Sequence, residues 1–170
     1  DLGGGRASAF KHLSGEFIAV LDTDDVWFSK KLEKQLQLFI DPEVGLVICD
    51  TLFFNKSNER AVYNGDFPPE GYVFRELLTG YFVSLVSLML RKSTVDRLDY
   101  GFDDDFSFIA DFDIVLRVAK ISKLVICKEV LAKWRVHEES DSWRAPVNFC
   151  YERERWIEKQ IKQDPGFFEK

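Results

Sequence analysis

Short apolar runs alternate along the chain with segments whose apolar residues recur at helical spacing. Four runs predict strands, at residues 16–21, 44–54, 83–90 and 124–136. Six segments predict helices, at residues 6–13, 30–40, 74–79, 92–98, 111–121 and 147–162. This alternation predicts an α/β sheet with helices on its faces. No boundary interrupts it, so we expect a single domain over residues 1–170, with the last helix packed on the same core.

One predicted helix follows Ser29, a residue type typical of helix N-caps. Leu32, Leu36 and Phe39 lie on one face of this helix, and we expect that face to point toward the core. Residues 55–70, by contrast, are polar and end in two prolines. They predict a loop over the surface.

An acidic cluster follows the first predicted strand, where Asp22, Asp24 and Asp25 come directly after an apolar run. Side chains two apart on an extended backbone point the same way, so Asp22 and Asp24 are expected to face one point. Open α/β sheets bind ligands at this edge, and paired carboxylates suit a hard cation that bridges phosphates. The alternative is a loop of acids that caps the next helix, a role that fits Asp25.

The charge balance narrows the classes of partner. The formal net charge is -6 and no stretch is strongly basic, which argues against a nucleic-acid partner. An acidic protein that binds an anionic ligand needs something to offset the repulsion, and a divalent metal is the obvious candidate. Cys49, Cys127 and Cys150 show no paired spacing, so we expect neither a disulfide framework nor a zinc site. The longest apolar stretch, residues 81–90, is too short to span a bilayer.

The acidic cluster lies in a longer familiar segment. Residues 15–27, GEFIAVLDTDDVW, followed by KLEKQ at residues 31–35, closely resemble the family 2 glycosyltransferases and their D-x-D motif. The resemblance implies the GT-A fold, with a mixed, mostly parallel sheet flanked by helices. It also implies transfer of a sugar from a nucleotide-diphosphate sugar, usually a UDP-sugar, to an acceptor hydroxyl with inversion. A complete GT-A domain begins with further strands, so we expect the chain to lack the first of them.

The same resemblance assigns roles in donor binding. It implies that Asp22 contacts the nucleotide ribose and that Asp24 binds Mn²⁺ or Mg²⁺ on the donor diphosphate. Arg6 stands where the family has an Arg that contacts the base, although Ala-Ser follows it here; the alternative is a solvated helix residue. Trp27 is a candidate for stacking on a sugar ring or for packing in the core.

Residues 108–117, FIADFDIVLR, resemble the segment that supplies the family's general base, which implies that role for Asp111. Ala110 replaces the usual Glu. The alternative for Asp111 is a helix N-cap, which would lower its pKa and weaken it as a base. Asp113 is expected to be a first-turn helix acid that pairs with Arg117.

Residues 134–137, WRVH, resemble a family segment whose His reaches the metal or the diphosphate in some relatives. The resemblance makes His137 a candidate metal ligand, and a surface polar residue is the alternative. Ser140, Ser142 and Trp143 follow it in sequence. The acidic stretch 103–105 is expected to be a solvated loop.

The resemblance further implies a saccharide or lipid-linked acceptor and a role in polysaccharide biosynthesis for the cell envelope. The resemblance fits a cytoplasmic location and is compatible with association at the inner face of the membrane. It is also compatible with a homo-oligomer. Two rivals stay open. Residues 18–26 also match the first motif of haloacid-dehalogenase-like phosphatases, and the loss of Glu at Ala110 fits a degenerate, non-catalytic carbohydrate- or partner-binding module.

Overall fold

The computed structural model describes residues 2–137 and 144–169. The strands of this part are β1 (Phe17–Ala19), β2 (Val26–Trp27), β3 (Val44–Phe54), β4 (Glu59–Ala61), β5 (Met89–Arg91) and β6 (Lys123–Arg135). The helices are α1 (Leu2–Phe10), α2 (Lys31–Leu36), α3 (Phe74–Thr79), α4 (Lys92–Val95), α5 (Ala110–Ala119) and α7 (Pro146–Gln163), with a 3-10 turn η1 (Leu85–Ser87).

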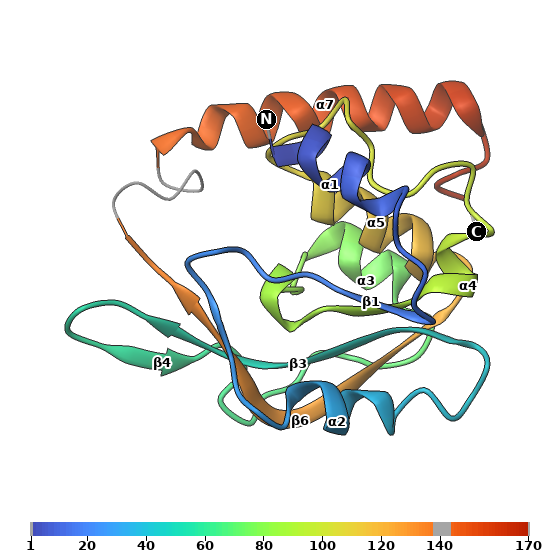
Figure 1. Cartoon of the computed structure of the whole chain (residues 1–170). Helices are drawn as coiled ribbons and strands as arrows, with labels where there is room; N and C mark the ends of the chain where they lie inside the picture. The colour runs from blue at the N-terminus through green and yellow to red at the C-terminus, as the bar shows by residue number, and fades with distance from the viewer. Residues whose placement is uncertain (1, 138–143, 170) are drawn as a thin grey trace.

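The strands form one mixed sheet in the order β1-β5-β3-β6-β2, with β4 paired to the far end of β3. Figure 1 shows α5, α3 and α1 on one side of this sheet, α7 outermost on that side, and α2 on the opposite side. The predicted sheet with helices on both faces is therefore confirmed. β4 was missed, because it lies in the polar segment that predicted only a loop.

The expectation of mostly parallel pairing is wrong for the described strands. Only β3 and β6 pair in parallel, and β1, β2, β4 and β5 all pair with antiparallel neighbours. An apolar run predicts that a strand exists, but the direction in which it enters the sheet depends on the connections around it. That information is not contained in the run itself.

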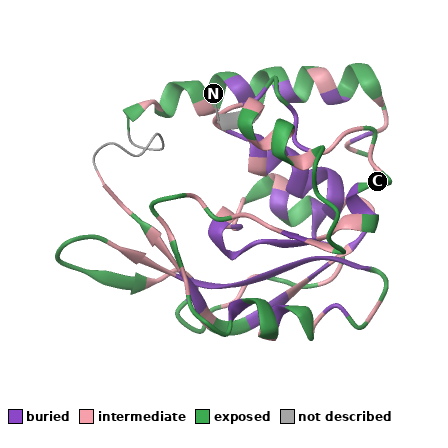
Figure 2. Cartoon of the chain, in the orientation of Figure 1, coloured by how far each residue is buried: buried purple, intermediate pink, exposed green. Residues whose placement is uncertain are grey.

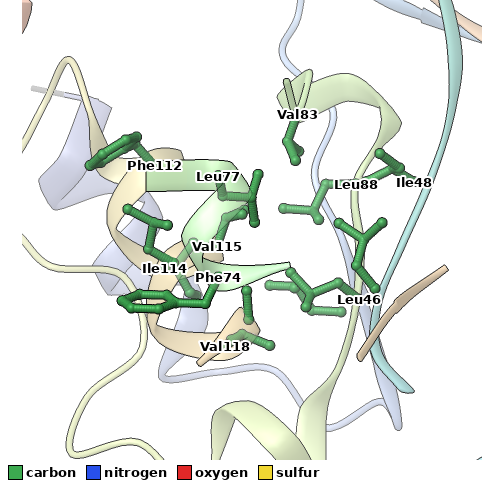
Figure 3. Packing of buried hydrophobic residues seen from close by; sticks show 14 of the residues in the cluster. Leu46, Ile48, Phe74, Leu77, Val83, Leu88, Phe112, Ile114, Val115 and Val118 are labelled. Carbon is green, nitrogen blue, oxygen red and sulfur yellow. The ribbon is translucent and has the colours of Figure 1, made fainter. Parts of the chain in front are cut away.

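The central strand β3 is buried over its first eight residues, and burial on both faces explains the apolar run at residues 44–49. Figure 2 shows the buried residues concentrated along β3 and in the helices above it. On that side Leu46 and Ile48 pack toward Leu77 of α3 and Val115 of α5 (Figure 3). Cys49 and Cys127 are buried on the α2 side of the sheet, in agreement with their apolar surroundings.

Two expectations about α2 are wrong. Leu32 and Leu36 are 41% and 43% exposed, whereas Lys31 and Gln35 are fully buried; of the predicted face only Phe39, which lies beyond the end of α2, is buried. The Gln35 amide donates to the carbonyls of Val47 in β3 (3.2 Å) and Ser87 in η1 (2.8 Å), so α2 buries a polar side chain that finds backbone acceptors below it. No side-chain hydrogen bond caps α2, and its N-cap position is Lys30 rather than Ser29.

Helix α7 packs on the main core through buried Trp156, whose indole donates to the Asp113 carboxylate at 2.8 Å. The predicted Asp113–Arg117 ion pair is also present. Asp103, however, is not part of a solvated loop. It is buried, and Lys159 of α7 donates to it at 2.7 Å, since a carboxylate enclosed by the helix needs a cationic partner.

None of the described helices is long and apolar enough to cross a membrane.

Candidate functional site

A cavity of about 650 Å³ opens between the sheet and the helices above it. Its walls come from the acidic turn after β1, residues 81–86, residues 107–112, the end of β6 and the first half of α7. Five of the six predicted site residues line it, namely Arg6, Asp22, Asp24, Asp111 and His137. Segments from both halves of the chain therefore meet at one place.

The acidic residues reach the cavity by a turn and not by the extended backbone that the sequence suggested. β1 ends at Ala19, and the Asp25 amide donates to the Asp22 carbonyl at 3.1 Å. The argument that alternate residues of a strand share a side therefore fails here. Asp22 and Asp24 nevertheless both line the cavity, because the turn folds its side chains toward it.

Arg6 of α1 pairs with Asp22 inside the cavity. One guanidinium nitrogen donates to both carboxylate oxygens, at 2.9 and 3.1 Å. The Arg6 side chain is only 15% exposed, so the alternative of a solvated helix residue is wrong. This contact fixes the Arg6 guanidinium beside the acidic turn.

Asp24 lies against His137, with 3.0 Å between carboxylate Oδ2 and imidazole Nε2. The end of β6 also binds the turn through Arg135, whose side-chain Nε donates to the Asp24 carbonyl (3.0 Å) and whose amide donates to the Asp25 carboxylate (2.9 Å). Asp25 therefore bonds to β6, and the prediction that it caps the next helix is wrong.

Burial raises the pKa of Asp25 to about 6, although the hydrogen bond from the Arg135 amide lowers this pKa. The neighbouring carboxylates of Asp24 and Asp22 add to this rise. Three carboxylates in one short turn repel one another, and a cation bound there would relieve the repulsion.

Asp111 occupies the second position of α5, and Ile109 is the N-cap residue. The N-cap alternative is therefore wrong, and so is the lowered pKa that came with it. Burial raises the pKa of Asp111, outweighing the hydrogen bond from the Tyr81 hydroxyl (3.1 Å), the amides at the helix start and the charge of Arg6. A raised pKa suits a carboxylate that accepts a proton.

Trp27 does not line the cavity. Its indole nitrogen donates to the Val86 carbonyl at 2.9 Å, and the Lys31 ammonium lies 4.4 Å from its ring centroid. Val86 itself lines the cavity, so Trp27 supports the wall from behind. Ser140, Ser142 and Trp143 lie outside the described residues.

The donor groups at the acidic turn fit a divalent metal. Asp24 offers carboxylate oxygens and His137 an imidazole nitrogen on one side of the cavity, and carboxylates are the ligands that Mn²⁺ and Mg²⁺ prefer. Within the described residues, the one cluster of three close carboxylates is Asp103, Asp104 and Asp105. Lys159 donates to two of these three, so an ammonium already supplies the positive charge there.

Sequence reasoning missed Tyr81 and Arg153, which also line the cavity. Tyr81 stands in an apolar run, and Arg153 belongs to an amphipathic helix with several other charged residues. Neither position carries a local signal of function, since only the packing of α3, α5 and α7 brings them to the cavity.

The sequence model described as "Glycosyl transferase family 2" matches residues 1–98, which is more than half of the chain. The chain belongs to this family. Family 2 membership agrees with the resemblance of the D-x-D segment, and it argues against the phosphatase alternative. The match ends before Asp111 and His137, so it does not itself cover the whole cavity.

Curated relatives of this family 2 chain include two named transferases. The Escherichia coli UDP-Glc:alpha-D-GlcNAc-diphosphoundecaprenol beta-1,3-glucosyltransferase WfgD is 23% identical over 141 residues, 82% of this chain and 53% of that protein. The uncharacterized glycosyltransferase MJ1057 of Methanocaldococcus jannaschii is 28% identical over 139 residues, 79% of this chain and 47% of that protein. The chain thus spans about half the length of these relatives.

Solved structures share the fold. The S. aureus protein TarS, residues 1–349, superposes with a TM-score of 0.66 at 15% identity, covering 94% of this chain and 44% of that one. Its complex with UDP gives a TM-score of 0.65 at 16% identity, with the same coverage. This likeness shows that the family 2 chain has the GT-A fold.

Proposed function

We propose that the protein transfers a sugar from a nucleotide-diphosphate sugar to an acceptor hydroxyl, with inversion and with the help of a divalent metal. The observation that carries the proposal is the single cavity that contains Arg6, Asp22, Asp24, His137 and Asp111. These residues supply a cation, paired carboxylates, an imidazole and a carboxylate with a raised pKa. Each corresponds to one requirement of the reaction.

The Arg6–Asp22 pair is the proposed nucleotide end of the site. Asp22 would accept hydrogen bonds from the ribose hydroxyls, and Arg6 would contact the base. Their mutual hydrogen bonds hold both side chains in place before the donor arrives. Such preorganisation lowers the entropic cost of binding.

Asp24 and His137 would hold Mn²⁺ or Mg²⁺. The metal would neutralise charge on the donor diphosphate, including the charge that develops as the diphosphate leaves. This chain needs that charge compensation, since the cavity has the carboxylates of Asp22, Asp24, Asp25 and Asp111 in its walls.

Asp111 would accept the proton of the acceptor hydroxyl as that oxygen attacks the anomeric carbon. A hydroxyl is a poor nucleophile, so a carboxylate with a raised pKa within hydrogen-bond reach accelerates the attack. Attack opposite the leaving diphosphate inverts the anomeric centre and needs no covalent intermediate. Tyr81 donates to Asp111 and thereby orients its carboxylate.

UDP is the proposed nucleotide. The name of WfgD specifies UDP-glucose, and TarS has been solved with UDP. A saccharide or lipid-linked acceptor and cell-envelope polysaccharide synthesis at the inner face of the membrane are the proposed context, because the acceptor named for WfgD is a diphosphoundecaprenol-linked sugar.

Calorimetric titration of UDP into the full chain, with and without Mn²⁺, tests the donor site. We expect binding that depends on Mn²⁺ and is lost in Asp24→Ala, because the metal loses its carboxylate. Asp104→Ala is the matched control, since this exposed aspartate belongs to the acidic cluster away from the cavity. Binding that needs neither Mn²⁺ nor Asp24 would overturn the proposal.

A further inference from the structure

Arg153 of α7 lines the same cavity as Arg6, but the two arginines differ in their ion pairs. Arg6 is paired with Asp22, whereas none of the carboxylates in residues 2–137 and 144–169 forms an ion pair with Arg153. The Arg153 guanidinium lies over the Phe112 ring, 4.9 Å from its centroid. An arginine stacked on an aromatic face keeps its N–H groups available for an anion.

The neighbouring residue fixes where Arg153 stands. Glu152 is buried, and its carboxylate accepts three hydrogen bonds from the backbone amides that lead into α5: Ser107 (3.1 Å), Phe108 (2.8 Å) and Ile109 (3.1 Å). One carboxylate thus satisfies three backbone amides of the segment that ends at the N-cap of α5. Because α7 is held at this point, the backbone of Arg153 has a defined position at the cavity wall.

The part of the cavity near Arg153 is otherwise largely apolar and aromatic. Phe108 and Phe149 lie in its wall with ring centroids 5.4 Å apart, and Phe112 packs on Tyr81 at 5.2 Å. Aromatic faces suit the apolar face of a sugar ring. Asp111, the proposed base, belongs to this same part of the wall, since it accepts the Tyr81 hydrogen bond and precedes Phe112.

We infer that Arg153 binds a phosphate or diphosphate carried by the acceptor, and that the acceptor is therefore a phosphorylated sugar. The inference rests on the proposed function, because it takes Asp111 as the base that faces the acceptor. A guanidinium presents parallel N–H donors that match phosphate oxygens. Arg153 is exposed where it lines the cavity, so a phosphate carried by an entering acceptor can reach its guanidinium.

The test compares glucose 1-phosphate with glucose as probes, titrated into the full chain with Mn²⁺ and saturating UDP. We expect the wild type to bind the phosphate at least about tenfold more tightly, as charge-assisted hydrogen bonds to one phosphate imply. Arg153→Gln should abolish this preference, and Arg153→Lys should keep part of it. Arg155→Gln is the matched control, since Arg155 is exposed on the same helix, as Arg153 is, but does not line the cavity.

A second probe, dodecyl glucosyl diphosphate, separates the two sources of phosphate. Arg153-dependent binding of either probe supports the inference, and tighter binding of the dodecyl compound identifies a lipid-linked acceptor. Equal affinity for glucose and glucose 1-phosphate in the wild type would overturn it, as would an unchanged preference in Arg153→Gln.

Arg153 could instead contact the donor, and the UDP titration reports on this. If Arg153→Gln weakens UDP binding as much as it weakens the phosphate probes, the acceptor assignment is wrong. Loss of UDP binding in Asp24→Ala with no effect of Arg153→Gln on either ligand would retain the proposed function and remove only this inference.

Discussion

At the scale of single residues, burial decides the acid–base behaviour of the cavity. Asp111 stands in the first turn of a helix, where the amides and the helix dipole favour the charged carboxylate. Its pKa is raised all the same, because enclosure among aromatic side chains disfavours the charge more strongly. The residue therefore keeps the basicity that the proposed proton transfer needs.

Tyr81→Phe tests this balance. The Tyr81 hydrogen bond lowers the pKa of Asp111, so its removal should raise that pKa further. The acidic limb of the rate–pH profile should then move to higher pH, because the base must be deprotonated to act. Sugar transfer is measured as UDP release across pH, with Tyr72→Phe, an exposed tyrosine bonded to Glu43, as the control.

Asp111→Asn is the reference variant for that experiment. It should remove the acidic limb of the rate–pH profile and lower the transfer rate about 10²–10⁴-fold, while Mn²⁺-dependent UDP binding persists. An acidic limb that stays in place in both variants would show that another group accepts the proton. UDP binding without any transfer by the wild type would favour the non-catalytic module.

Lys31 gives a prediction about stability. Its ammonium is fully buried, has no hydrogen-bond partner among the described residues and lies over the Trp27 ring. Burial lowers the pKa of Lys31 from its usual 10.5 to about 8. Between these values the unfolded chain binds more protons than the folded one, so the free energy of unfolding should rise with pH.

Relative to Lys31→Met, the wild type should gain on the order of 2–3 kcal/mol of stability between pH 8 and 10.5. Urea unfolding at several pH values measures the difference, and the subtraction removes the contributions of other groups. Lys56→Met, at an exposed lysine, is the control. A difference that does not depend on pH would mean that Lys31 stays charged in the folded protein.

At the scale of elements, α5 and α7 form one unit that supplies much of the proposed acceptor side of the cavity. Trp156 of α7 donates to buried Asp113 of α5, and Glu152 caps the start of α5. Helices normally rely on local caps, but here the cap comes from a segment more than 40 residues later. The position of Asp111 therefore depends on the docking of α7.

Glu152→Gln should lower the free energy of unfolding by about 1–3 kcal/mol, because an amide cannot accept all three backbone hydrogen bonds with a full negative charge. The transfer rate should fall as well, through the altered position of α5. Urea unfolding and UDP release provide the two measurements. Glu154→Gln, exposed on the same helix, should match the wild type, and equal stability of both variants would contradict the capping role.

At the scale of the whole molecule, the cavity joins the two halves of the chain. Arg6, Asp22 and Asp24 come from the part that matches the family model, and Asp111 and His137 come from beyond it. The sheet makes this possible, because β3 from the first half pairs in parallel with β6 from the second half. This pairing places the two halves side by side. The proposed donor and acceptor sides of the reaction thus depend on one central strand pair.

The sequence by itself determined most of the helices, the central strand and the family to which the acidic turn belongs. The strand β3 and the short helix α3 were predicted with the bounds that the structure has. An apolar run and a helical spacing are both patterns of residues that are close together in the chain. The D-x-D segment identified the family for the same reason, since its residues are close together in the chain.

Only the tertiary structure decided the rest. The strand directions, the burial of Lys31 in place of Leu32, and the raised pKa of Asp111 all depend on what distant segments place around these residues. Tyr81 and Arg153 reach the cavity only through helix packing. Burial and charge pairing are properties of neighbours in space, and the order of residues along the chain does not state which neighbours those will be.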